Sequence, residues 1–383
     1  MIMWKVPLFE LNYDNRESKA VLDVINSQWL TMGEQTINFE KQFSLMLNHP
    51  DVQCVFVSNC TAALYMSVLA LGLEKGDEVI IPSLTFVADL NATIMAGAKP
   101  VLADCNSLDD WNISAESIEK CITSKTRAVM VVHYAGYPCD MDPIVELCEK
   151  HNLFLIEDVA HAPGATYKGK ACGTIGDIGC FSFFSNKNIS MGEGGMLSTC
   201  NPELFQTLKY IRSHGMSSLT LDRHKGRTIS YDVIRTGLNF RSDEIHAALG
   251  LVQLEKLQES NMLRKNLTDY YRLKLGAVKG LDMPFKHTKD TVSAYHVLPV
   301  LLDKGIDRID LITKLKEAGI QASIHYPSFH QFSAFKSLNL NPAPIADQIS
   351  ERELTLPLYP GLSFDLVDLV VRTIDSSLKK VSI

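Results

Sequence analysis

Short apolar runs alternate with helical patterns over residues 55–197, and this alternation constrains the fold more than any other feature of the chain. The apolar runs are rich in β-branched and aromatic residues and are bounded by turn residues, as buried strands are. They lie at 54–57, 78–81, 128–132, 153–156, 179–184 and 195–198. Helical patterns separate them, as at 61–71, 89–96 and 142–151. Such alternation predicts an α/β fold in which helices cover a mostly parallel sheet.

The C-terminal part of the chain has a different pattern. A long helical pattern runs from Ser242 to about Lys274, followed by an apolar run at 294–302 and a further helical pattern at 309–318. A chain of 383 residues is long enough for one large and one smaller domain. We therefore predict a large domain over residues 1–241 and a small α+β domain over residues 242–383.

Charge and cysteine content exclude several classes of protein. The net charge of -7 disfavours nucleic acid or an anionic membrane surface as the partner, and no apolar stretch has the length of a membrane span. The N-terminus lacks the pattern of a signal peptide, so we expect a cytoplasmic protein. The nine cysteines do not show the spacing of a zinc site or a redox pair, so no metal is predicted.

Two residues carry the strongest chemical signal. Asp158 follows the predicted strand at 153–156, and Lys187 follows the predicted strand at 179–184. Open α/β folds bind ligands where the carboxyl ends of parallel strands meet, so both residues are expected at one edge of the sheet. Pyridoxal 5'-phosphate (PLP) chemistry needs this pair, because a carboxylate keeps the pyridine nitrogen protonated and a lysine holds the cofactor as a Schiff base and moves protons. The pair predicts a PLP enzyme with Asp158 and Lys187 as catalytic residues.

Other residues near the same edge have two interpretations. Residues 58–63 follow a strand and open an apolar helix, whose N-terminus would hold a phosphate or would simply be capped by these side chains. Phe86 would stack on a flat cofactor ring or belong to the core. His161 would contact the phenolic oxygen of the cofactor or pack in the interior.

Ordered motifs along nearly the whole chain resemble the DegT/StrS family of sugar aminotransferases, within the aspartate aminotransferase superfamily. The motifs lie at 58–64, 76–86, 96–100, 157–158, 164–167, 181–187, 192–195, 237–241 and 356–362. The resemblance implies PLP fold type I, with a mostly parallel seven-stranded sheet flanked by helices and a smaller C-terminal α+β domain. It also implies a homodimer with shared active sites.

The resemblance assigns a role to each matching position. Lys187 matches the lysine that holds the cofactor, Asp158 the partner of the ring nitrogen, and Phe86 the stacking aromatic. The expected phosphate contacts are Thr61, Ala62, Ser182 and, from the second subunit, Asn239. His161 stands where the family often has glutamine. Cys60 replaces a usual glycine, which raises the question of the backbone conformation there.

The resemblance further implies amination of a keto sugar carried on a nucleotide, with the 4-keto-6-deoxy type common in the family. Glutamate would be the amino donor, and pyridoxamine 5'-phosphate the intermediate form of the cofactor. The candidate substrate residues are Thr31, Gly33, Arg223, Lys225, Arg227, His325 and Tyr326. The basic residues among them would pair with a diphosphate, or would form an ordinary exposed charged loop.

Three other functions compete with this one. Transamination of a cyclitol ketone, or of a sugar without a nucleotide, would use the same lysine and aspartate. A regulatory or binding protein that had lost turnover would not need to retain them. A nicotinamide-dependent dehydrogenase is disfavoured, because no Gly-x-Gly-x-x-Gly turn follows the first strand.

Overall fold

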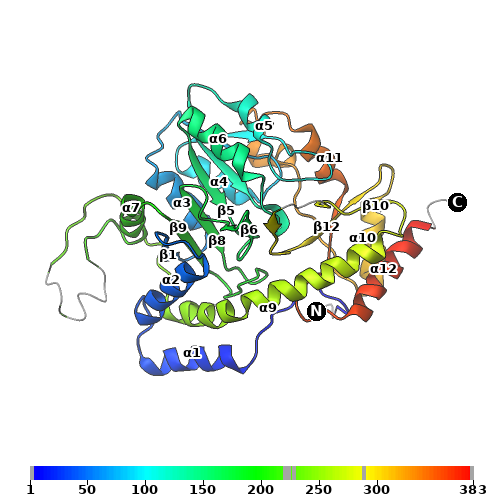
Figure 1. Ribbon diagram of the computed structural model, residues 1–383, viewed down its shortest axis with the longest axis horizontal. Helices are drawn as coiled ribbons and strands as arrows, with labels where there is room; N and C mark the ends of the chain where they lie inside the picture. The colour runs from blue at the N-terminus through cyan, green and yellow to red at the C-terminus, as the bar shows by residue number, and fades with distance from the viewer. Residues whose placement is uncertain (1–3, 219–225, 227–229, 287–289, 380–383) are drawn as a thin grey trace.

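A seven-stranded sheet lies at the centre of the larger part of the molecule (Figure 1). The computed structural model describes residues 4–218, 226, 230–286 and 290–379. The strand order is β1-β9-β8-β5-β4-β2-β3, and β9 runs antiparallel to both of its neighbours. The strands are β1 (Gln53–Val57), β2 (Glu78–Pro82), β3 (Lys99–Ala103), β4 (Thr126–Val132), β5 (Phe154–Asp158), β8 (Ile178–Ser182) and β9 (Gly195–Thr199). The predicted α/β fold with a mostly parallel sheet is confirmed.

Strand β3 was not predicted from the apolar runs. It begins with Lys99 and Pro100, which are untypical of a buried strand. The strand lies at the edge of the sheet, next to β2. Proline is tolerated in edge strands because its missing N–H group can face away from the neighbouring strand.

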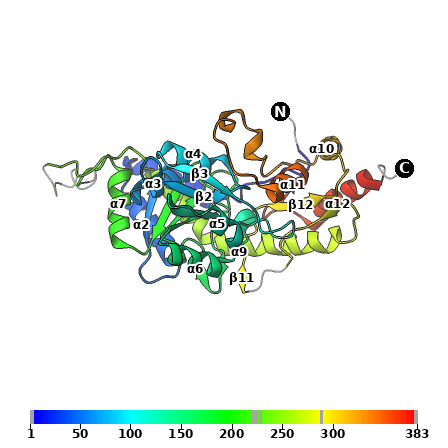
Figure 2. The same ribbon diagram turned by 90° about the horizontal axis from the view of Figure 1, so that it is seen from above.

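Helices cover both faces of the sheet, as the view from above shows for α4 and α6 (Figure 2). Alternate residues of a strand point to opposite faces, so neighbouring residues of β4, Met130 and Val129, lie in different cores. One face is covered by α3 (Cys60–Ala70), α4 (Val87–Met95) and α7 (Pro202–Arg212). The other is covered by α2 (Glu34–Met46), α5 (Ala115–Cys121) and α6 (Met141–His151).

Helix α9 (Glu244–Leu275) connects the two parts of the molecule (Figure 1). Its N-terminal half packs against α1 (Asn15–Ser27) and α2, whereas Leu267 and Tyr271 lie in the core of the smaller part. The long helical pattern is therefore one continuous helix. The division of the chain at residues 241 and 242 remains a prediction.

The smaller part contains a three-stranded sheet in the order β10-β12-β13. Val6, from the start of the chain, packs into the same core. The elements of this part are β10 (Leu281–Asp282), β12 (Leu298–Leu302), α10 (Arg308–Glu317), α11 (Pro344–Arg352), β13 (Glu353–Leu356) and α12 (Phe364–Lys379). A second small sheet joins β6 (Thr166–Tyr167), β7 (Lys170–Ala171) and β11 (Thr291–Val292). Short 3-10 turns lie at η1 (Tyr134–Gly136), η2 (Phe329–Gln331) and η3 (Ser333–Phe335).

The described helices include none with the combination of length and apolar character that crossing a membrane requires.

Candidate active site

A cavity of about 550 Å³ lies at the carboxyl ends of β2, β4, β5 and β8. It brings together most of the predicted site residues, although they come from segments far apart in the sequence. The predicted residues that line it are Thr61, Phe86, Asp158, His161, Ser182, Lys187, His325 and Tyr326. The sheet edge is therefore the place where a ligand would meet these side chains.

Asp158 and Lys187 both line this cavity, and they lie close enough for the charge of each to affect the pKa of the other. Asp158 is the buried last residue of β5, and its Oδ1 accepts the N–H of Ala160 at 2.7 Å. The Lys187 N–H donates to the Phe184 carbonyl at 2.8 Å, which fixes the turn after β8. Burial lowers the pKa of Lys187 to about 8, with the charge of Asp158 opposing that shift. The lysine therefore exchanges its proton readily near neutral pH.

A second carboxyl group, Asp89, lies behind Asp158 and was not predicted. Asp89 is fully buried in the first turn of α4, and its Oδ2 accepts the Thr85 hydroxyl at 2.5 Å. Burial, followed by the neighbouring Asp158, raises the pKa of Asp89 well above its ordinary value. Two such groups in a buried site share a proton. Because Asp158 also receives the Ala160 N–H, the proton resides on Asp89.

The start of α3 has both a side-chain cap and free backbone amides, the two interpretations that the sequence left open for residues 58–63. Asn59 caps the helix, its Oδ1 accepting the Ala62 N–H at 2.8 Å. The preceding amides, of Cys60 and Thr61, belong to the first turn, whose N–H groups have no intrahelical partner. Cys60 is the first residue of the helix and is not in the left-handed region, so this position does not require glycine. The position of Gly195 does require glycine, because a Cβ there would meet the Asn59 backbone at 2.5 Å.

His161 is held in one tautomer by its neighbours. Its Nδ1 accepts the Ala135 N–H at 3.3 Å, so its proton lies on Nε2 and is donated to the Tyr326 hydroxyl at 3.0 Å. Burial lowers the pKa of His161 well below its ordinary value, so the ring is neutral. The Tyr326 ring in turn lies 5.6 Å from that of Phe86, which is 53% exposed.

The smaller part of the molecule contributes further residues that were not predicted. His296 is buried with its Nε2 3.5 Å from Lys187 Nζ. Glu353 is fully buried and accepts the His325 N–H at 2.7 Å. The sequence signal for His296 was its position as a polar residue within the apolar run at 294–302. No local pattern places that histidine beside a lysine more than a hundred residues earlier.

Some predicted residues do not line this cavity. Asn239 is exposed and pairs with Ser213 in an isolated bridge. Ala62 lies in the first turn of α3, where its N–H is taken up by the cap. Arg223, Lys225 and Arg227 lie outside the described residues.

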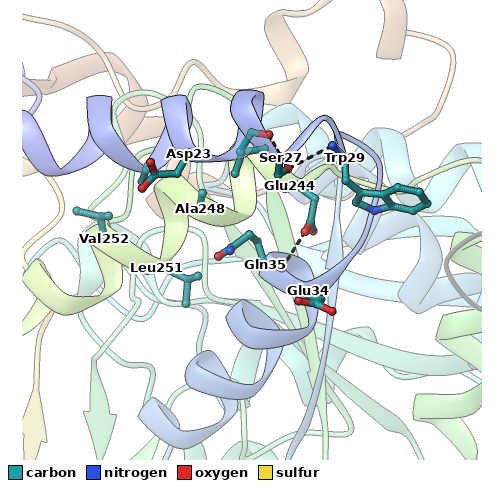
Figure 3. A pocket seen from close by; sticks show the side chains of 11 residues that line it. Asp23, Ser27, Trp29, Glu34, Gln35, Glu244, Ala248, Leu251 and Val252 are labelled. Atoms are coloured by element: carbon teal, nitrogen blue, oxygen red, sulfur yellow. Dashed lines mark hydrogen bonds between the residues drawn. The ribbon is translucent and has the colours of Figure 1, made fainter. Parts of the chain in front are cut away.

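A second cavity, of about 450 Å³, lies between α1, α2 and α9 (Figure 3). Thr31 and Gly33 belong to the segment that joins α1 to α2. Thr31 forms a bridge with Asp243. Gly33 donates its N–H to Glu244 at 2.8 Å, and a Cβ at this position would meet the Trp29 ring at 2.6 Å. The geometry accounts for Gly33 through packing and helix capping.

Comparison with known proteins agrees with the geometry of the first cavity. Residues 12–375 match the DegT/DnrJ/EryC1/StrS aminotransferase family. The chain is 35% identical over 371 residues to GDP-perosamine synthase of Escherichia coli O157:H7, covering 97% of this chain and 98% of that protein. It superposes with a TM-score of 0.91 on Helicobacter pylori PseC, an aminotransferase involved in the biosynthesis of pseudoaminic acid, at 28% identity and with 98% and 99% of the two chains covered.

A Streptococcus pneumoniae protein described as a sugar aminotransferase, in its PLP form, has a TM-score of 0.89 at 28% identity, with 99% and 98% of the chains covered. Fold, sequence match and the lysine–aspartate pair therefore lead to one conclusion. The chain belongs to the DegT/DnrJ/EryC1/StrS aminotransferase family, and it is a PLP-dependent aminotransferase.

Proposed function

We propose that this enzyme transfers an amino group from glutamate to a keto sugar carried on a nucleotide, and that 4-keto-6-deoxy sugars are its acceptors. The observation that carries the proposal is that Lys187 and buried Asp158 line one cavity at the sheet edge. The name of the relative GDP-perosamine synthase supports an acceptor linked to a nucleotide. A setting in amino sugar or polysaccharide biosynthesis follows from this acceptor class.

The residues of the cavity fit PLP. The first-turn amides of α3 and the Ser182 side chain would hold the phosphate, since a helix N-terminus favours an anion. Asp158 would hold the proton of the ring nitrogen, and Phe86 would cover one ring face. The buried Asn186 Oδ1, in a side chain that lines the cavity, has no partner among the described residues and would be satisfied by a ligand.

When bound, PLP supplies an electron sink that makes the carbon next to the amine acidic. Lys187 would move that proton in both halves of the reaction, because a pKa near 8 suits a base that also acts as an acid. Asp158 would stabilise the charge that develops on the cofactor side. Neutral His161 and Tyr326 would line the ring without adding charge.

The second subunit has a place in this proposal. Asn239 would reach the phosphate of the partner's site, which agrees with its exposure and with its not lining the cavity of its own chain. Arg223, Lys225 and Arg227 would pair with the nucleotide diphosphate. Replacing these three basic residues should raise KM for the sugar nucleotide and leave KM for glutamate unchanged; an equal rise in both would count against the assignment.

An absorption spectrum tests the proposal directly. The purified protein with PLP should show a band of the lysine-bound cofactor, and glutamate should convert that band to the one of pyridoxamine phosphate. Keto sugars with and without a nucleotide, and a cyclitol ketone, would then be added to the converted enzyme. Return of the first band with the nucleotide-linked sugars alone supports the proposal, whereas return with a free sugar or cyclitol favours the rival acceptor. Failure to form any band would favour the non-catalytic alternative.

A further inference from the structure

We propose that His296 is a positioning residue for Lys187, which accepts a hydrogen bond from the lysine amine through Nε2. This role deepens the proposed function, on which its catalytic consequence rests. His296 lies at the start of the segment that leads into β12, so the smaller part of the molecule would control the geometry of the lysine at the sheet edge.

Asn188 determines which nitrogen of His296 carries the proton. The Asn188 Nδ2 donates to Asn261 Oδ1 and to the Ala294 carbonyl, each at 2.7 Å. Both amide protons are therefore used, and the Asn188 oxygen must be the atom that lies 2.9 Å from His296 Nδ1. A carboxamide oxygen can only accept. His296 therefore carries its proton on Nδ1.

The lone pair of His296 is consequently on Nε2, the nitrogen 3.5 Å from Lys187 Nζ. Burial, Lys187 and nearby basic groups lower the pKa of His296 well below its ordinary value, so the ring stays neutral. A neutral acceptor suits both the charged and the free amine of Lys187, each of which has an N–H to donate. One N–H of the Lys187 amine thus points toward His296 Nε2, and the lone pair of the free amine stays available for proton transfer.

The backbone around His296 holds the ring in place. Its N–H donates to the Ala135 carbonyl at 2.9 Å, and its carbonyl accepts from buried Arg264 at 3.0 Å. The His161 ring lies 4.6 Å away. Because these contacts come from three separate segments, the acceptor cannot follow a lysine that swings away. The lysine would therefore return to one position each time it leaves the cofactor.

The titratable and charged groups around this pair come from several elements. Those that act on Lys187 are Asp158 and Cys60. Those that act on His296 are Lys187, His161, Arg264 and His325. A change in the pKa of Lys187 can therefore be assigned to His296 only in variants that change His296 and leave these neighbours in place.

The test is the pKa of Lys187 in the cofactor-free protein, measured from the pH dependence of its reductive methylation by peptide mass spectrometry. A neutral acceptor stabilises the charged amine more than the free amine. His296→Phe should therefore lower the pKa of Lys187 by about one pH unit. His296→Gln, which restores an acceptor, should recover most of the difference. His151→Phe, at an exposed histidine of α6, is the matched control and should cause no shift.

The tautomer provides a second readout. Nitrogen chemical shifts of labelled histidine, assigned with the His296→Gln variant, should show His296 neutral and protonated on Nδ1. Asn188→Asp keeps an acceptor and should preserve this tautomer, whereas Asn188→Leu should allow the ring to turn its N–H toward Lys187. In the loaded enzyme, His296→Phe should slow conversion by glutamate at least tenfold without weakening glutamate binding.

An unchanged pKa of Lys187 in His296→Phe, or a His296 protonated on Nε2 in the parent protein, would overturn the proposal. Thermal unfolding of each variant separates this role from a structural one, since a loss of stability alone leaves the pKa of Lys187 in place. The titration uses no substrate. A failure to find a keto sugar acceptor would therefore leave it intact, and the two proposals can fail independently.

Discussion

Two of the cavities in the larger part of the molecule are similar in size and different in chemistry. The cavity at the sheet edge, about 550 Å³, contains Lys187, Asp158 and His161, whose pKa values are displaced by burial. The cavity between α1, α2 and α9, about 450 Å³, contains buried Glu244 (Figure 3). Its carboxylate accepts the N–H groups of Gly33, Gln35 and Thr36 and the Thr36 hydroxyl.

The difference lies in how each buried charge is satisfied. Glu244 caps the N-terminus of α2, whose own cap residue is a glycine with no side chain to offer. A carboxylate placed there is fully used by the fold. Lys187 and Asp158, by contrast, retain hydrogen-bonding capacity toward an open space. Volume alone therefore does not identify a site, whereas incompletely satisfied titratable groups do.

The largest effect is expected at Lys187. Lys187→Ala should lower kcat by roughly 10⁴-fold or more, because the nucleophile and the proton carrier are lost together. Lys187→Arg is the matched variant, since it keeps the positive charge but does not act as a base, and it should be nearly as inactive. Turnover is measured with glutamate and a keto sugar nucleotide, and circular dichroism checks the fold. Retained turnover in either variant would remove Lys187 from the mechanism.

The next effect concerns Glu353, which supports the His325 backbone at the edge of the first cavity. Burial raises the pKa of Glu353 to about 8, so the folded protein keeps a proton there that the unfolded chain loses near pH 4.5. The native state binds more protons in this window, and stability therefore falls as pH rises from about 4.5 to about 8. The side chain of Glu353→Gln does not titrate. The free energy of unfolding of this variant, relative to that of the parent, should therefore rise by up to roughly 4 kcal/mol across that window.

Urea unfolding of both proteins at a series of pH values measures this gain. The difference between their free energies of unfolding should be smallest near pH 4.5 and should grow toward pH 8. A difference that stays constant with pH would mean that Glu353 is not protonated in the folded protein.

A smaller effect, on stability rather than activity, is expected in the second cavity. Glu244→Gln should cost about 2 kcal/mol, because the amide group replaces an acceptor oxygen that receives N–H groups. Thermal unfolding measures the loss. The kcat of the remaining folded enzyme should equal that of the parent. A tenfold fall in kcat without loss of stability would mean that the second cavity has a role in the reaction.

The smallest effect is expected at Asp89. Since this carboxyl group is protonated beside Asp158, Asp89→Asn replaces it with a neutral group of the same shape that can still donate to Asp158. The change in kcat should stay below about tenfold. Asp89→Leu, which cannot donate, serves as the contrast and should shift the pH–rate profile. Equal profiles for the Asn and Leu variants would show that the second carboxyl group has no influence on Asp158.

Local patterns in the sequence predicted the sheet, the covering helices and the central pair. Strands and helices have local signatures in apolar spacing. The carboxyl ends of parallel strands share an edge, so the positions of Asp158 and Lys187 after their strands were enough to place them together. The ordered motifs along the chain also predicted the family. Strand β3 was not predicted from local patterns. Pro100 is tolerated there because the strand lies at the edge of the sheet, and that position depends on the arrangement of the whole sheet.

The residues that complete the site could not be predicted in this way, because they come together only when the chain is folded. From the smaller part of the molecule, His296 contacts Lys187 and Glu353 accepts the His325 N–H, and no spacing along the chain encodes these contacts. Asp89 has the pattern of an ordinary helical residue, and only burial and the nearness of Asp158 change its proton affinity. Gly33 was a candidate substrate residue, but its N–H is taken up by Glu244. Burial and partners at long sequence separation set the charge of a side chain, and both arise from packing rather than from the local sequence.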